Sequence, residues 1–77
     1  MRAREVVRRI EQAKCGEERA CSRLRQRGSH IIFECRCRGT VCVTSVPDHG
    51  SHDLGIGLLR SIERDLEPCL GEGWLTR

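Results

Sequence analysis

His30 is the residue whose type and position best suit catalysis. It follows Gly28 and Ser29 and opens a run of alternating apolar residues, so we expect it at the start of a strand, on the side away from Phe33. Imidazole both accepts and donates protons near neutral pH, as cleavage of a phosphodiester through a ribose 2′-hydroxyl requires. A glycine two residues earlier would let another backbone approach closely. A lone strand histidine is otherwise an ordinary surface residue, so His30 alone leaves both interpretations open.

Three arginines precede His30 at a spacing of two. The alternation of Arg23, Arg25 and Arg27 with uncharged residues predicts that all three project from one side of a strand. A guanidinium group is well shaped to hold a phosphate or to stabilise charge that develops on it. The turn expected at residues 28–29 decides which sheet face the arginines share with His30, and the sequence does not fix that turn.

Positive charge is concentrated in the first half of the chain. Residues 1–38 contain eleven Arg or Lys against five Glu, whereas residues 39–77 contain three Arg against six acidic residues. A basic half is expected of a protein with a phosphate-bearing partner, because each neutralised phosphate releases counterions. A solvated basic surface would explain the same distribution.

The length and composition predict one small domain. With 77 residues, 38% of them hydrophobic, the chain can form one core and is too apolar for a disordered tail. We place a single domain over residues 1–77, with its core at about 3–67 and an irregular tail at 68–77, in which Trp74 tucks back onto the core. The charged opening residues are not followed by the apolar segment of a signal peptide. No stretch of the sequence approaches the run of about 20 apolar residues that is needed to cross a bilayer. We therefore expect a cytoplasmic protein.

Hydrophobic periodicity predicts the secondary structure. An amphipathic helix is expected over residues 3–14, and Pro68 should end a second helix that contains Leu58, Leu59, Ile62 and Leu66. Between them we expect a polar link at 17–19 and three strands, at 21–27, 30–37 and 40–46. The order helix, three-stranded antiparallel sheet, helix is an α+β fold with both helices on one sheet face. The other face is left bare for binding.

The six cysteines are expected to be free thiols, because a chain without a signal peptide stays in a reducing compartment. No pair has the two-residue gap typical of structural zinc sites and thioredoxin-like redox sites. We expect Cys35 and Cys37 to act as small apolar residues beside Phe33. His49 and His52 could suggest a metal site with Cys42, but a fourth ligand and the usual spacing are missing. We therefore predict no metal and no cofactor.

Four segments resemble the HicA family of messenger-RNA-cleaving toxins. They are REVVRRIE at residues 4–11, RQRGSHIIF at 25–33, VTSVPDH at 43–49 and GLLRSI at 57–62, in the family's order and through about the first 66 residues. The chain departs from the family pattern in a longer polar link after Gly16, in Ser45, and in the tail beyond Pro68.

The resemblance implies a double-stranded-RNA-binding-domain-like fold and metal-independent mRNA cleavage that inhibits translation and growth. It also implies that His30 is essential, that Gly28 supports it through the backbone, and that a HicB antitoxin neutralises the toxin in a hetero-oligomer. We expect the bare sheet face to bind RNA through Arg23, Arg25, Arg27, Ser29 and Arg36. His49 could assist His30 or only solvate its loop.

Two other interpretations stay open. In one, the same arginines make the chain a non-catalytic RNA-binding module with His30 as a surface residue. In the other, the cysteines make it a metal or redox protein. The acidic residues Glu63, Asp65 and Glu67 could contact an antitoxin or form a solvated helix face.

Overall fold

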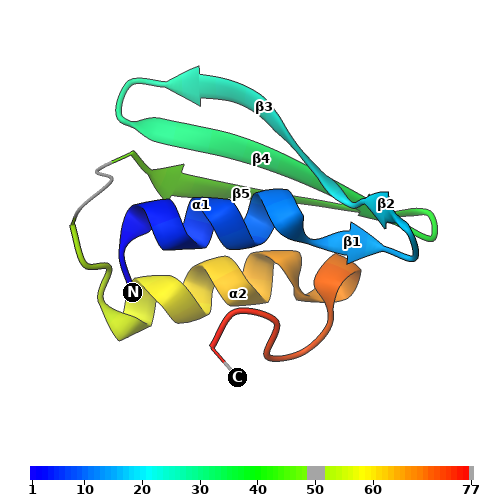
Figure 1. The fold of residues 1–77 in the computed structure, drawn as a ribbon. Helices are drawn as coiled ribbons and strands as arrows, with labels where there is room; N and C mark the ends of the chain where they lie inside the picture. The colour runs from blue at the N-terminus through cyan, green and yellow to red at the C-terminus, as the bar shows by residue number, and fades with distance from the viewer. Residues whose placement is uncertain (49–51, 77) are drawn as a thin grey trace.

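The computed structural model describes residues 1–48 and 52–76 and has the predicted α+β order. Its elements are α1 (Ala3–Gln12), β1 (Lys14–Cys15), β2 (Glu18–Arg19), β3 (Cys21–Arg27), β4 (His30–Cys37), β5 (Thr40–Pro47) and α2 (Ile56–Leu70). Both helices lie on the same face of the sheet (Figure 1). Among the described helices, none combines the length and the apolar character needed to cross a membrane.

The main sheet is an antiparallel meander with the strand order β3-β4-β5. Gly28 starts the two-residue turn between β3 and β4 with φ +56°, a backbone conformation that favours glycine. Arg38 and Gly39 form the turn between β4 and β5, both with positive φ, as a type I′ hairpin requires. Short turns of this kind make β4 the central strand, with His30 at its first position.

The core fills the space between the sheet and the two helices. From β4, Ile31, Phe33 and Cys35 are buried, as the alternating pattern predicts. The helices add Val6 and Ile10 from α1 and Leu59, Ile62 and Leu66 from α2, and all five are buried. No helix formed by the described residues covers the opposite face of the sheet. We call it the open face; by strand register it includes Arg25, Arg27, His30, Ile32, Glu34, Arg36, Val41, Val43, Ser45 and Pro47.

A short hairpin stands where a polar link was expected. Lys14 pairs with Arg19 and Cys15 with Glu18, around a turn at Gly16 with φ +65°. Helix α1 accordingly ends at Gln12, two residues earlier than predicted. Strands of two residues are too short to show a period in the sequence. The disulfide that holds Cys15 could not be recognised from cysteine spacing alone.

The prediction of free thiols was wrong for four of the six cysteines. Disulfides join Cys15 to Cys37 and Cys21 to Cys35. The physical reason is the fold: Cys21 lies directly opposite Cys35 on neighbouring strands, and the hairpin brings Cys15 to the end of β4, with a Cα separation of 5.6 Å from Cys37. Two nested disulfides therefore hold one end of the sheet together.

Cys42 and Cys69 remain free and buried beside this disulfide pair. Cys42 lies opposite Cys35 on β5, and the two free sulfur atoms are 2.9 Å apart. Burial, followed by the hydrogen bond to Cys42, raises the pKa of the Cys69 thiol to about 11. At neutral pH Cys69 is therefore a protonated, unreactive thiol.

Helix α2 continues through Pro68 to Leu70, two residues beyond its predicted end. Proline has no backbone N–H, so this turn lacks the hydrogen bond that another residue at position 68 would donate to the Arg64 carbonyl oxygen. The chain then folds back on α2, as expected for Trp74. The Trp74 indole N–H donates to the Glu63 carbonyl oxygen (2.7 Å), and the Glu63 carboxylate accepts the Leu75 backbone N–H (2.9 Å). The side chain of Leu75 is buried.

Candidate functional site

The turn before His30 is tied to the end of β5. The Asp48 backbone N–H donates to the Ser29 carbonyl oxygen (2.5 Å). The Gln26 side-chain amide donates to the Asp48 carboxylate (3.1 Å) and to the Gly28 carbonyl oxygen (3.3 Å). A Cβ on Gly28 would meet nothing within 4 Å, so its positive φ, and not the close approach expected from the sequence, is what calls for glycine. These contacts fix the backbone from which His30 projects.

His30 lies on the open face and its side chain is exposed. It pairs directly with Arg27 across the hairpin, and directly paired residues of antiparallel strands project to the same side. Arg25 pairs with Ile32 and so lies on this face too. No hydrogen bond or ion pair joins the imidazole to another side chain in residues 1–48 or 52–76. The structure thus brings together an accessible imidazole and two arginines.

Arg23 lies on the helix side of the sheet, so the prediction that three arginines share one face was wrong. The register shifts between Arg23 and Arg25, which makes Leu24 the extra residue of a β-bulge. Arg23 therefore lies opposite the buried Phe33, with its guanidinium carbon 5.8 Å from the ring centroid, and pairs with Glu11 of α1 at 3.2 Å. Its charge is turned away from His30.

The bulge has a physical cause in the cysteines. Continuous pairing from Arg27 and His30 would place Leu24 opposite Phe33 and Cys21 opposite Arg36. The extra residue instead aligns Cys21 with Cys35, where the disulfide forms. The cost is exposure of Leu24, whose surface is 51% accessible. Strand β3 therefore combines a disulfide at one end with arginines beside His30 at the other.

Arg36 shares the open face but lies far from His30. Arg36 lies six positions further along β4, which corresponds to about 20 Å along an extended strand. Its guanidinium pairs with Glu34 at 2.9 Å. Ser29 is exposed in the turn beside His30, and its carbonyl oxygen already accepts from Asp48. Arg27, Arg25 and Ser29 are thus the predicted residues that lie around the imidazole.

The remaining histidines do not extend this group. His49 lies outside the described residues. His52 is docked at the start of α1, where its carbonyl oxygen accepts the Ala3 backbone N–H (3.1 Å). Within the described part of the chain, no three His, Cys, Asp or Glu side chains gather as a metal site would require.

Two of the three acidic residues of α2 hydrogen-bond to other parts of the chain. The Asp65 carboxylate accepts the Thr44 hydroxyl (2.9 Å), and the Glu63 carboxylate accepts the Thr76 backbone N–H (2.6 Å). Of the three acidic residues considered as an antitoxin contact, Glu63 and Asp65 therefore have roles within the fold.

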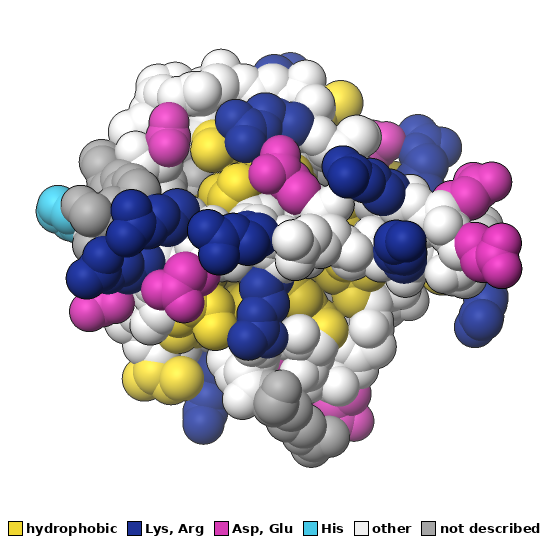
Figure 2. Space-filling model, in the orientation of Figure 1, with side chains coloured by type: hydrophobic (Ala, Val, Ile, Leu, Met, Phe, Trp, Pro, Cys, Tyr) yellow, Lys and Arg dark blue, Asp and Glu magenta, His cyan; other side chains and the backbone are white. Residues whose placement is uncertain are grey.

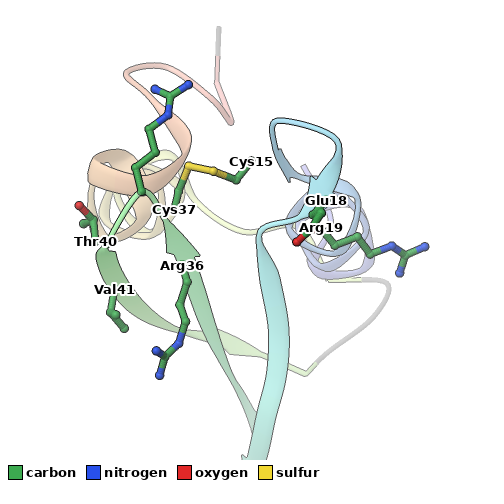
Figure 3. Close-up of a pocket in the computed structure, with 9 residues that line it drawn as sticks. Cys15, Glu18, Arg19, Arg36, Cys37, Thr40 and Val41 are labelled. Carbon is green, nitrogen blue, oxygen red and sulfur yellow. A yellow bond between two sulfur atoms is a disulfide. The ribbon is translucent and has the colours of Figure 1, made fainter.

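One hollow in the described part of the chain lies away from His30. It has a volume of about 390 Å³ and lies beside the Cys15–Cys37 disulfide. Figure 3 shows the Arg19 and Arg36 side chains pointing in different directions, away from that disulfide. A binding pocket for a small anion would need its polar groups to converge. The hollow therefore lacks the arrangement that the open face has around His30.

The open face also carries exposed apolar side chains. Val41 and Val43 of β5 are 49% and 51% accessible, and by register they lie opposite Arg36 and Glu34. Apolar surface between charged side chains suits a partner that is itself both apolar and charged, such as nucleobases on a phosphate backbone or a protein surface. The β-branched content of residues 40–46 predicts a strand but does not show that these two valines are exposed, because apolar residues occupy both of its faces.

Comparison with known proteins identifies the family. No curated protein and no solved structure matches the chain. The family model described as the HicA toxin of bacterial toxin–antitoxin systems matches residues 3–67, which include both helices up to the last turn of α2, the whole sheet and His30. The chain therefore belongs to the HicA family and is the toxin of a toxin–antitoxin system.

Proposed function

We propose that this toxin is an endoribonuclease that cleaves messenger RNA on the open face and thereby inhibits translation and growth. One observation carries the proposal: His30 is exposed and directly paired with Arg27 on the face without helices. A proton-transfer group thus lies beside a guanidinium that can bind the reacting phosphate. Arg25 and Ser29 lie next to them and would hold the RNA.

The chemistry uses the RNA's own 2′-hydroxyl as the nucleophile. Neutral His30 removes the hydroxyl proton, and the 2′-oxygen attacks the adjacent phosphorus. The bond from phosphorus to the 5′-oxygen then breaks, and the leaving oxygen takes a proton from water. The products end in a 2′,3′-cyclic phosphate and a 5′-hydroxyl. Arg27 would stabilise the negative charge that grows on the phosphate, and the scheme calls for no metal ion.

Replacement of His30 tests the catalytic role. His30→Ala should reduce cleavage of mRNA by at least about 100-fold, the usual lower range for acid–base catalysis, and should relieve growth arrest. His52→Ala provides a histidine control that should keep full activity. The assay contains EDTA and a second substrate with 2′-deoxyribose at the cut position, which should stay intact.

Three results would contradict the proposal. A folded His30→Ala protein that still cuts RNA would remove His30 from the mechanism, and products with a 5′-phosphate would exclude 2′-hydroxyl attack. RNA binding by the wild type without any product would instead favour the non-catalytic RNA-binding module.

His49 is proposed as an assisting residue, because it follows the strand that pairs with His30 by only two positions. A His49→Ala variant with an unchanged pH–rate profile would remove it from the scheme. Gly28 is proposed to act through the backbone, by placing His30.

We further propose that the partner is a HicB antitoxin, that the two form a hetero-oligomer, and that the toxin acts in the cytoplasm, where mRNA is translated. Expression of the neighbouring reading frame should relieve growth arrest, and the two chains should copurify. Failure of both would contradict this partner.

A further inference from the structure

A second basic surface lies on the helix side of the sheet. A groove of about 270 Å³ runs between α1 and the edge strand β3. Three arginines line it: Arg4, Arg8 and Arg23. The other lining residues are Ala3, Val7, Glu11, Ile31 and Asp48. Figure 2 shows Lys and Arg side chains gathered over α1 at the centre of this face, with apolar side chains between them.

The positive charge of this groove is only partly balanced. Glu11 neutralises Arg23, while Arg4 and Arg8 form no ion pair with any residue that the structure describes. They lie one helical turn apart on α1, where like charges repel by about 0.2–0.5 kcal/mol. Arg4 is also in the first turn, where the helix dipole is positive. An anion in the groove would relieve both repulsions.

The groove ends at the turn that carries His30. Asp48 lines the groove, and its backbone N–H holds the Ser29 carbonyl oxygen. The Asp48 carboxylate accepts a hydrogen bond from the neutral Gln26 amide and keeps its negative charge, so the groove holds three arginines against two carboxylates. A strand that reacts at His30 on the open face can therefore reach the groove by passing around the β3–β4 turn.

We propose that the groove between α1 and β3 binds backbone phosphates of the same RNA strand, beside the phosphate that is cut. Arg4 and Arg8 contact two phosphates, and Arg23 shapes the groove while Glu11 holds its guanidinium. The proposal rests on RNA being the substrate. The groove is continuous with the turn at His30, so one RNA strand could contact both. An acidic protein segment bound in the groove would not need to reach His30, and we therefore favour RNA as the occupant.

The test measures binding without cleavage. The full-length protein carries His30→Ala, and the probe is a fluorescently labelled, mixed-sequence single-stranded oligoribonucleotide. Adding Arg4→Gln and Arg8→Gln should weaken binding on the order of tenfold at low salt. The slope of log affinity against log salt should fall by about 1.4, since each contact to a single strand contributes about 0.7. Melting curves verify that the variant is folded.

A matched control removes the same charge elsewhere. Arg60 and Arg64 are exposed arginines one turn apart on α2, outside the groove. Their replacement by Gln in the His30→Ala protein should change the affinity much less and leave the salt slope almost unchanged. Replacing Arg25 and Arg27 tests the open face separately.

The outcomes separate this inference from the proposed function. If the His30→Ala protein binds no RNA, the proposed substrate is wrong and the inference falls with it. If RNA binds and the groove variant behaves like the α2 control, the groove inference alone is overturned. It is also overturned if the groove variant binds RNA normally but loses its antitoxin, because the groove is then a protein interface.

Discussion

Reduction of the two disulfides should destabilise the toxin strongly. They close loops of 14 and 22 residues, one inside the other. By chain entropy, the inner loop contributes about 3 kcal/mol. With the inner disulfide formed, the outer one closes only about eight further residues, which lowers its contribution to about 2.5 kcal/mol. Full reduction should therefore remove about 5 kcal/mol, a large share of the 5–15 kcal/mol typical of a domain.

Urea unfolding followed by fluorescence measures this effect. Trp74 is the only tryptophan, and its indole is bonded to α2, so its emission should change when the tail leaves the helix. The oxidised protein, the reduced protein and a Cys15→Ala/Cys37→Ala double variant are compared. The double variant isolates the half-exposed outer disulfide and should lose about 2.5 kcal/mol. Coincident curves for the oxidised and reduced proteins would contradict this prediction, because they would mean that the disulfides do not restrict the unfolded chain.

Two further predictions concern single residues. The fold raises the pKa of Cys69 to about 11 from an ordinary value of 9.0, so the alkylation rate of Cys69 should still rise between pH 9 and 11 in the folded protein, whereas it levels off in the unfolded chain. Mass spectrometry of the alkylated peptide measures this rate. A plateau near pH 9 in the folded protein would contradict the prediction. Gly28→Ala should lower the free energy of unfolding by about 1–2 kcal/mol because its φ is +56°, and urea melting would measure this; an unchanged midpoint would show that the turn adapts.

The fold could be predicted from the sequence where elements are long enough to show a period. Helix α2 and strands β4 and β5 each span eight residues or more: α2 has apolar residues at helical spacing, β4 has buried residues that alternate along one face, and β5 is rich in β-branched residues. The two-residue strands β1 and β2 have no such period. Their pairing depends on a contact with Cys37, which is 22 residues away from Cys15, and spacing carries no signal of that contact.

The candidate site was partly predictable for a similar reason. The exposure of His30 follows from its position in β4, because strand alternation decides it. The face on which Arg23 lies does not follow from alternation, because the extra residue Leu24 reverses the facing of every side chain that precedes it in β3. The position of the extra residue, Leu24, is coupled to the alignment of Cys21 with Cys35, which is a contact between two strands. Alternation counted along β3 alone cannot detect it.

The bulge in β3 also bears on how the sheet meets other chains. Strands β3 and β5 are the two edges of the sheet, and an edge strand offers unpaired backbone groups to a strand of another molecule. Strand β3 carries three arginines and a bulge, and both hinder such pairing. Strand β5 contains no charged residue and exposes Val41 and Val43. Growth of the sheet by strand addition, whether in a complex or in an aggregate, is therefore directed to β5 and is disfavoured at the arginine edge.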